Sequence, residues 1–133
     1  MDEPRKMGLN DYTLVAAKDT ERWFGDTIRG DEWDRLTQLA HYVLALNGEA
    51  GELANIVKKI QRGSHSIHDA ATRHHLMMEA MDVQMYLFNI YGALNMNAEK
   101  MYEYVRGQNE KRFLEQRKER DDERKRQRAA GES

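Results

Sequence analysis

Proline occurs once in this chain of 133 residues, as Pro4, and residues that favour helices dominate the sequence beyond it. A proline inside a helix removes a backbone hydrogen bond and clashes with the preceding turn, so its absence permits long helices. No segment shows the alternation of β-branched and polar residues that is typical of strands. The sequence therefore predicts an all-α fold.

Capping residues and glycines divide the chain into four expected helices, which we expect to form a four-helix core bundle. Residues 25–31 contain two glycines and are expected to form a loop, and Gly63 is a good stop for the second helix. The expected helices run from Asn10 or Asp11 to Phe24, from a cap at Asp31 to Arg62, from about Ala70 to Leu94, and from a cap at Asn97 onward.

Apolar residues recur at helical spacing and indicate which faces are buried. On the second helix they are Leu36, Leu39, Ala40, Val43, Leu44, Leu53, Ile56, Val57 and Ile60, and on the third Leu76, Met77, Ala80, Val83, Leu87, Ile90 and Tyr91. The methionine- and tyrosine-rich faces offer more apolar surface than one small monomer should bury (Met77, Met78, Met81, Met85, Tyr86 and Tyr91). We therefore expect a homo-oligomer, either a dimer or a tetramer.

Charge and composition narrow the class of protein. The net charge is −2 and cysteine is absent, which argues against a global nucleic-acid footprint, disulfides and thiolate zinc sites. The N-terminus lacks the apolar core of a signal peptide and no apolar run reaches membrane-spanning length, so we expect a cytoplasmic protein without membrane partners. Acidic and basic residues alternate near the C-terminus, and we expect a helical domain over residues 1–113 with a charged extension over 114–133.

Two acidic pairs interrupt otherwise apolar helix faces. Glu49 and Glu52 lie in the second helix, and Glu79 and Asp82 lie in the third. Residues three apart on a helix share one face, so each pair presents two carboxylates together. Such a concentration of negative charge is costly unless a cation neutralises it.

The pairs predict a magnesium site between facing helices. Mg²⁺ prefers oxygen ligands and completes its shell with water and phosphate oxygens, which implies a nucleotide or another polyphosphate as ligand; Mn²⁺ is a substitute. The alternative is that these are ordinary surface acids. A di-iron bundle is rejected because no glutamate is followed by histidine at the Glu-x-x-His spacing.

Gly48 and Gly51 fall inside the second helix, where each costs about 1 kcal/mol relative to alanine. Two interpretations stay open. The glycines permit close packing between helices, or they give a ligand access, or a local kink, beside Glu49 and Glu52.

The spaced acidic pairs resemble a known family. Glu49-x-x-Glu52, followed after 26 residues by Glu79-x-x-Asp82, is similar to the signature of the MazG-like, all-α nucleoside triphosphate pyrophosphohydrolases. The flanking segments agree, and residues 109–113 (NEKRF) resemble the Asn/Lys/Arg element of the last core helix. The resemblance covers residues 33–113.

This resemblance implies Mg²⁺-dependent cleavage of a nucleoside or deoxynucleoside triphosphate to the monophosphate and pyrophosphate. Glu49, Glu52, Glu79 and Asp82 would be the catalytic acids and would hold the metal. Sequence does not rank the four acids, although Glu52 is preferred as the base that accepts a proton from the attacking water.

Lysine and arginine side chains in the segments that resemble the family are candidates for phosphate contacts. Lys59 is favoured over Lys58, because it lies about two turns beyond Glu52 on the same face. Lys111 and Arg112 are further candidates, and each of these cations is alternatively a solvated surface residue.

Polar and aromatic side chains are candidates for the nucleoside. Asn109 would contact a sugar hydroxyl, a phosphate or the base, and Tyr86 lies one turn beyond Asp82. In some family members aromatic residues at the positions of Trp33 and Tyr86 line the base pocket. Trp23 or Phe24 on the first helix would close this pocket. The alternative is that all four aromatic residues are core, and it is favoured for Trp23 and Phe24.

Other functions remain open at this point. A non-catalytic helical module that binds a nucleotide or a protein would retain the same acids. An adaptor whose charged tail binds nucleic acid is a weaker alternative, because acids are interspersed among its bases. Four histidines near the third helix lack a zinc pattern and are interpreted as surface residues (His65, His68, His74 and His75).

Overall fold

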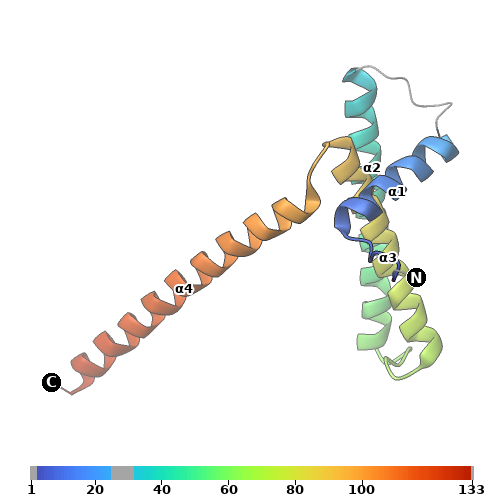
Figure 1. Cartoon of the computed structure of the whole chain (residues 1–133). Coiled ribbons are helices and arrows are strands. Elements are labelled where there is room, and N and C mark those ends of the chain that lie inside the picture. The colour runs from blue at the N-terminus through green and yellow to red at the C-terminus, as the bar shows by residue number, and fades with distance from the viewer. Residues whose placement is uncertain (1–2, 25–31, 133) are drawn as a thin grey trace. The chain divides into compact units, whose positions relative to one another are not determined.

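The computed structural model describes residues 3–24 and 32–132, with only the backbone described at 23–24 and 32–34. The described residues form α1 (Leu9–Phe24), α2 (Glu32–Gln61), α3 (Ala70–Ala93) and α4 (Ala98–Gly131), without any strand (Figure 1). The all-α prediction is confirmed. The predicted loop over residues 25–31 and the predicted cap at Asp31 lie outside the described residues.

The chain forms two compact units, Met1–Asn97 and Ala98–Ser133. In the first unit, α3 packs against both α2 and α1. Figure 1 shows α2 and α3 as antiparallel neighbours, joined by residues 62–69. The second unit consists of α4, so the place of this helix in a four-helix core and a domain boundary after residue 113 stay predictions.

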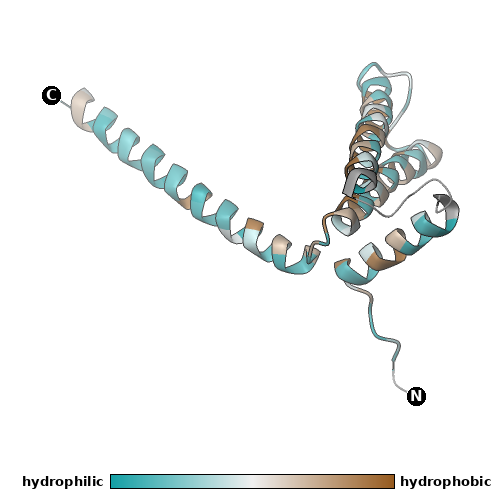
Figure 2. Ribbon diagram, turned by 90° about the horizontal axis from the view of Figure 1, so that it is seen from above, coloured by the Kyte–Doolittle hydropathy of each residue, from teal (hydrophilic) through white to brown (hydrophobic). Residues whose placement is uncertain are grey.

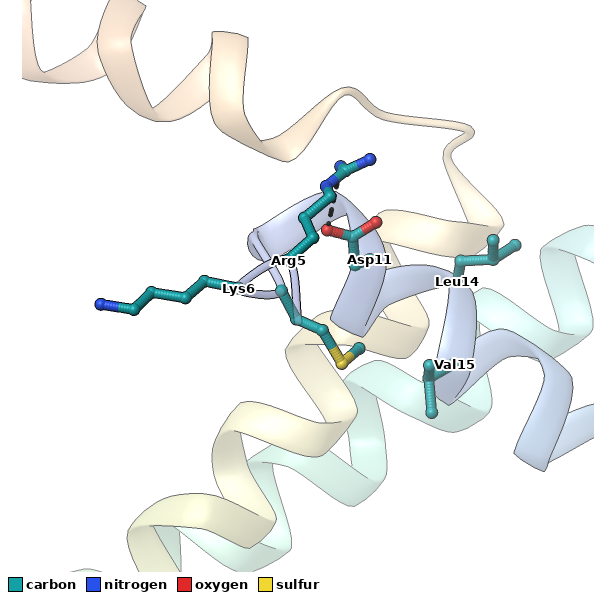
Figure 3. Close-up of a pocket in the computed structure, with 6 residues that line it drawn as sticks. Arg5, Lys6, Asp11, Leu14 and Val15 are labelled. Carbon is teal, nitrogen blue, oxygen red and sulfur yellow. Dashed lines mark hydrogen bonds and ion pairs between the residues drawn. The ribbon is translucent and has the colours of Figure 1, made fainter. Parts of the chain in front are cut away.

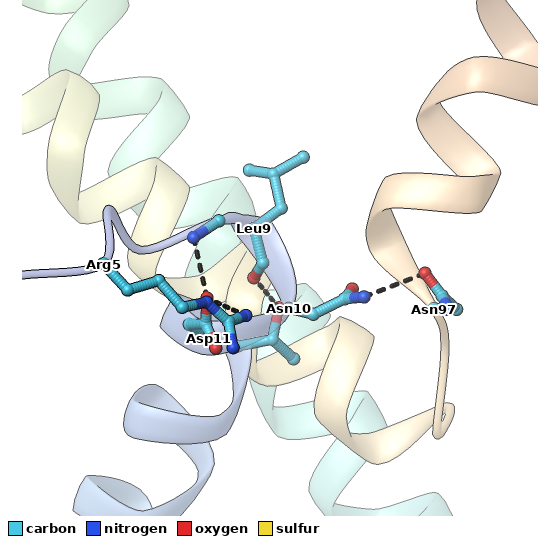
Figure 4. Close-up of polar contacts among 7 residues, drawn as sticks. Arg5, Leu9, Asn10, Asp11 and Asn97 are labelled. Carbon is cyan, nitrogen blue, oxygen red and sulfur yellow. Dashed lines mark hydrogen bonds and ion pairs between the residues drawn. The ribbon is translucent and has the colours of Figure 1, made fainter.

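The start of α1 is capped from inside the helix. The carboxylate of Asp11 accepts a hydrogen bond from the backbone N–H of Gly8 at 2.8 Å, which satisfies a donor that has no partner within the helix. The side-chain amide of Asn10 donates to Oδ1 of Asn97 at 2.9 Å (Figure 4). The helix begins at Leu9, so the prediction that Asn10 or Asp11 precedes it was wrong by one or two residues.

Helix α2 ends where the sequence predicts. Gly63 has φ +80°, and its N–H donates to the carbonyl of Ile60 at 3.0 Å, while the N–H of Ser64 donates to the carbonyl of Lys59 at 3.1 Å. This pair of bonds is the Schellman motif, which requires a residue in the left-handed region and therefore favours glycine. The same motif closes α3, with Asn95 at φ 48°.

Helix α3 begins at an N-cap. The Asp69 carboxylate accepts hydrogen bonds from the hydroxyl and the backbone N–H of Thr72, at 2.9 and 3.0 Å. These bonds lower the pKa of Asp69 below its ordinary value, the hydroxyl bond first. The cap fixes the register at which α3 starts against α2.

The core of the first unit is small and lies where α3 meets its neighbours. Phe88, only 6% exposed, stacks on Tyr12 of α1 with a centroid distance of 5.9 Å and meets Tyr91 edge-on at 6.2 Å. The Thr20 hydroxyl donates to Oδ1 of Asn89 at 2.5 Å and also bonds the buried Tyr42, so α1 is tied to both other helices.

Several predicted core residues are exposed. Leu44 is 72% and Met77 is 66% exposed, and Leu36 and Ala80 also face solvent, whereas the buried Tyr42 was not among the predicted core residues. Two helices that pack mainly against each other bury only a narrow stripe of each, so apolar residues on the outer part of a broad face stay uncovered.

Helix α4 is hydrophilic along most of its length (Figure 2). Its large apolar side chains lie in its N-terminal half and are exposed (Met101, Tyr102, Tyr104, Val105, Phe113 and Leu114). The charged extension predicted over residues 114–133 is helical as far as Gly131. Among the described helices, none is long and apolar enough to cross a membrane.

Replacing Phe88 by alanine should destabilise the first unit by about 3 kcal/mol, because it removes a buried aromatic ring and leaves a cavity. Arg73→Ala is the control, since this residue lies on the same helix but is exposed, and it should change stability by less than about 0.5 kcal/mol. Urea unfolding followed by tyrosine fluorescence measures both. Equal losses in the two variants would contradict this description of the core.

Candidate metal centre

Three carboxylates converge between α2 and α3. Glu49 projects from α2, and Glu79 and Asp82 project from α3; one carboxylate oxygen of each lies within 4.8 Å of the others. The spacing of three residues puts Glu79 and Asp82 on one face of α3, and the antiparallel packing of the helices brings Glu49 opposite them. The predicted convergence of acids from two helices is therefore present for these three.

Glu79 is the most buried member of the cluster, with a side chain that is 13% exposed. Its Oε1 accepts a hydrogen bond from Nε2 of His75 at 3.0 Å. Its Oε2 is buried and has no hydrogen-bond partner among the described residues. Buried carboxylate oxygens are nearly always satisfied, so this atom is suited to a cation or a proton.

Glu49 is electrostatically unfavourable as an anion. Loss of hydration raises the pKa of Glu49 above its ordinary value, and the negative charges of Glu52, Asp82 and Glu79 raise it further. The carboxyl groups of Glu49 and Glu79, which have oxygens within 4.8 Å of each other, are stable together only with a proton or a cation between them.

The donor set fits a small hard cation. All three groups offer carboxylate oxygens, the ligand type that Mg²⁺ prefers over nitrogen or sulfur. Opposite ligands of an octahedral Mg²⁺ lie about 4 Å apart. At most one pair among three ligands can be opposite, and adjacent ligands lie about 3 Å apart. The three oxygens, which lie within 4.8 Å of one another, would therefore draw closer together around a bound ion.

Glu52 lies beside the cluster rather than in it. Its side chain is exposed, and it is not among the three carboxylates that converge. Its negative charge nevertheless acts on Glu49 more strongly than that of any other group. The quartet predicted from sequence is thus a triad with a fourth acid one turn away on α2.

The two glycines of α2 leave open space around the backbone. An ideal Cβ built at Gly48 or at Gly51 would meet no other described atom within 4 Å. Close packing among the described residues of the first unit therefore does not explain them. The alternative interpretation, access beside Glu49 and Glu52, remains a prediction.

The predicted substrate contacts of the first unit lie on the same two helices as the triad. Lys58 and Lys59 are exposed in the last turn of α2, and Tyr86 is half-buried on α3. Trp33 lies in the first turn of α2, but its side chain is outside the described residues, as are those of Trp23 and Phe24.

The remaining predicted contacts belong to the second unit. Asn109, Lys111 and Arg112 are exposed on α4, and the guanidinium of Arg112 donates to Oδ1 of Asn109 at 3.2 Å. This bond places Asn109 and Arg112 on one face of α4, as their spacing of three residues requires. Their approach to the acidic triad stays a prediction.

Sequence reasoning missed the role of His75 in this geometry. It was grouped with three exposed histidines, yet it bonds Glu79 while its own side chain is 60% exposed. The available signal was the spacing of four residues, which puts His75 and Glu79 on the same helix face.

A shallow hollow elsewhere does not coincide with the triad. It lies at the N-terminus, where Arg5 pairs with Asp11 at 3.4 Å and Lys6, Leu14 and Val15 form the walls (Figure 3). The Arg5 side chain is 86% exposed, so solvent screens this ion pair and it contributes little to stability.

No family model matches the chain. It is similar to the Gene 37 protein of Mycobacterium phage L5, with 33% identity over 85 residues that cover 64% of this chain and 71% of the phage protein. The chain belongs to the family of that phage protein. The name of this relative states no activity.

Stability should depend on pH through Glu49. Because its pKa is raised in the folded state, the folded chain binds a proton there more readily than the unfolded chain does. The destabilising contribution is fully present above the raised pKa, and it disappears as the pH falls towards the unfolded value of 4.5. Glu49→Gln should therefore be more stable than the wild type at pH 7 in EDTA, and the difference should shrink towards pH 4.

Urea unfolding at several pH values measures this difference. Glu21→Gln, which removes an exposed acid on α1, is the control and should show no comparable trend. A Glu49→Gln effect that is the same at pH 7 and pH 4 would show that the other carboxylates do not act on Glu49.

Proposed function

We propose that this chain is a Mg²⁺-dependent nucleotide pyrophosphohydrolase, which hydrolyses a nucleoside or deoxynucleoside triphosphate to the monophosphate and pyrophosphate. The observation that carries the proposal is the convergence of Glu49, Glu79 and Asp82 from two helices, with a buried and unpartnered oxygen on Glu79. The choice of reaction rests on the resemblance of both acidic pairs to those of the MazG-like enzymes.

Glu49, Glu79 and Asp82 would hold the metal, with Mn²⁺ as a substitute for Mg²⁺. When bound, the metal supplies Lewis acidity and neutralises phosphate charge. Three carboxylates leave part of an octahedral shell open to phosphate oxygens and water. This arrangement also relieves the repulsion that raises the pKa of Glu49.

Glu52 is suited to receive the proton of the attacking water. It is exposed, lies one turn from Glu49 and is not one of the three converging acids, so its carboxylate stays available as a base. The open backbone at Gly48 and Gly51 leaves room for phosphate oxygens beside it.

The remaining roles concern binding. Lys59, Lys111 and Arg112 would neutralise phosphate charge, with the planar guanidinium able to form two parallel bonds. Trp33 and Tyr86 would stack on the base, and Asn109 would bond the sugar, a phosphate or the base.

The wild-type protein should release pyrophosphate from a panel of nucleoside and deoxynucleoside triphosphates with Mg²⁺, and should release none in EDTA. Glu79→Gln should lower turnover at least about a hundredfold, because even residues that only support metal ligands alter activity 10- to 100-fold. Glu21→Gln removes the same charge from α1 and should leave turnover unchanged.

The assay separates the proposal from its alternative. Mg²⁺-dependent binding of a nucleotide without any pyrophosphate release would indicate a non-catalytic module. Turnover by Glu79→Gln at the wild-type rate would remove Glu79 from the site.

We also propose that the chain acts as a homo-oligomer, either a dimer or a tetramer. Six large apolar side chains of α2 and α3 are about half exposed or more (Leu36, Val43, Leu44, Met77, Met78 and Met81). Met77, Met78 and Met81 lie within about one turn of one another on α3. Clustered exposed apolar groups of this kind often mark a surface that another protein chain covers.

Light scattering coupled to gel filtration should give a mass that is a multiple of 15.6 kDa. The double substitution Leu44→Glu with Met78→Glu should weaken association more than about tenfold, because it requires desolvation of two charges. Ile67→Glu, at an exposed apolar site in the 62–69 connection, is the control and should not alter the mass. A monomeric wild type at about 100 μM would contradict the proposal, since this exceeds the Kd range of stable assemblies.

A further inference from the structure

We propose that His75 is a positioning residue that holds the Glu79 carboxylate in place for metal binding; this inference rests on the metal centre of the proposed function. Nε2 of His75 lies 3.0 Å from Oε1 of Glu79, one helical turn further along α3. Since an ionised carboxylate only accepts hydrogen bonds, the imidazole donates Nε2–H. A neutral imidazole is sufficient for this bond.

The bond acts on the two oxygens of Glu79 differently. Oε1 is engaged by His75, whereas Oε2 is buried and has no hydrogen-bond partner among the residues that the structure describes. A histidine that engages one oxygen therefore leaves the other for a cation and fixes the plane of the carboxylate. Mutation of groups that hold metal ligands in this way typically weakens metal binding about 10- to 100-fold.

The hydrogen bond between His75 and Glu79 counteracts the repulsion among the three carboxylates. Glu49 and Asp82 each offer a carboxylate oxygen within 4.8 Å of Glu79, and without a cation these charges push the Glu79 side chain away. The hydrogen bond from His75 opposes that displacement from the same helix. The ligand is thus held near its binding position before the metal arrives, which reduces the ordering required on binding.

A simpler interpretation makes a different prediction. An exposed pair spaced by four residues on a helix contributes slightly to helix stability and nothing to a neighbouring ligand. Under that interpretation, loss of His75 changes the melting temperature but leaves metal affinity as it was. Metal affinity is therefore the quantity that separates a positioning role from a structural one.

The test is a Mn²⁺ titration of chelator-treated full-length protein, with free Mn²⁺ followed by its electron paramagnetic resonance signal. His75→Phe keeps a ring but removes the donor, and the Kd for Mn²⁺ should rise about tenfold or more. His75→Gln retains an N–H donor and should restore the Kd to within about threefold of the wild type. His74→Ala removes the adjacent exposed histidine and should bind Mn²⁺ as the wild type does.

The outcomes divide clearly. A raised Kd in His75→Phe with rescue in His75→Gln supports the inference, and the exposed position of His75 makes both variants compatible with folding. Wild-type affinity in His75→Phe overturns it while leaving the metal centre intact. Equal weakening in both variants also overturns it, because a donor would then not matter. If the wild type itself binds no Mn²⁺, the metal centre of the proposed function fails as well.

Discussion

Repulsion between carboxylates from two helices is the interaction on which the site depends. Glu49 and Glu79 come together because α2 and α3 pack side by side, so the apolar contacts of that pair hold negative charges close to one another. The cost is visible as the raised pKa of Glu49 and the unsatisfied Oε2 of Glu79. Helix packing therefore keeps these carboxylates close despite their repulsion, and binding of a cation or a proton would reduce that repulsion.

Few buried groups hold this arrangement in place. Helix α3 is the central element, because it contacts α2 along the triad and α1 through Phe88 and the bond between Thr20 and Asn89. The capped start at Asp69 and the Schellman end at Asn95 set where this helix begins and stops. Much of the outer apolar surface is uncovered, so packing alone does not fix the limits of the helices. Capping hydrogen bonds at the helix ends therefore determine a large part of the fold.

Local features could be predicted from the sequence, and features that depend on how helices face one another could not. The stop at Gly63 and the start at Ala98 follow from capping chemistry within a few residues. The acidic pairs follow from spacing within one helix, but which three acids converge depends on the register between α2 and α3. Likewise, Met77 lies on a broad apolar face, and periodicity does not decide which part of that face is covered.

The open backbone at Gly48 and Gly51 has a consequence for attempts to make this protein more robust. Alanine at either position would favour the helix by about 1 kcal/mol. No atom of the described part of the first unit lies within 4 Å of the added methyl group. These are therefore the positions that a search for thermal tolerance would select first. Gly48 lies four residues before Glu52 on the same helix face, so under the proposed function a methyl group there would restrict access to that acid, and robustness would be gained at the expense of activity.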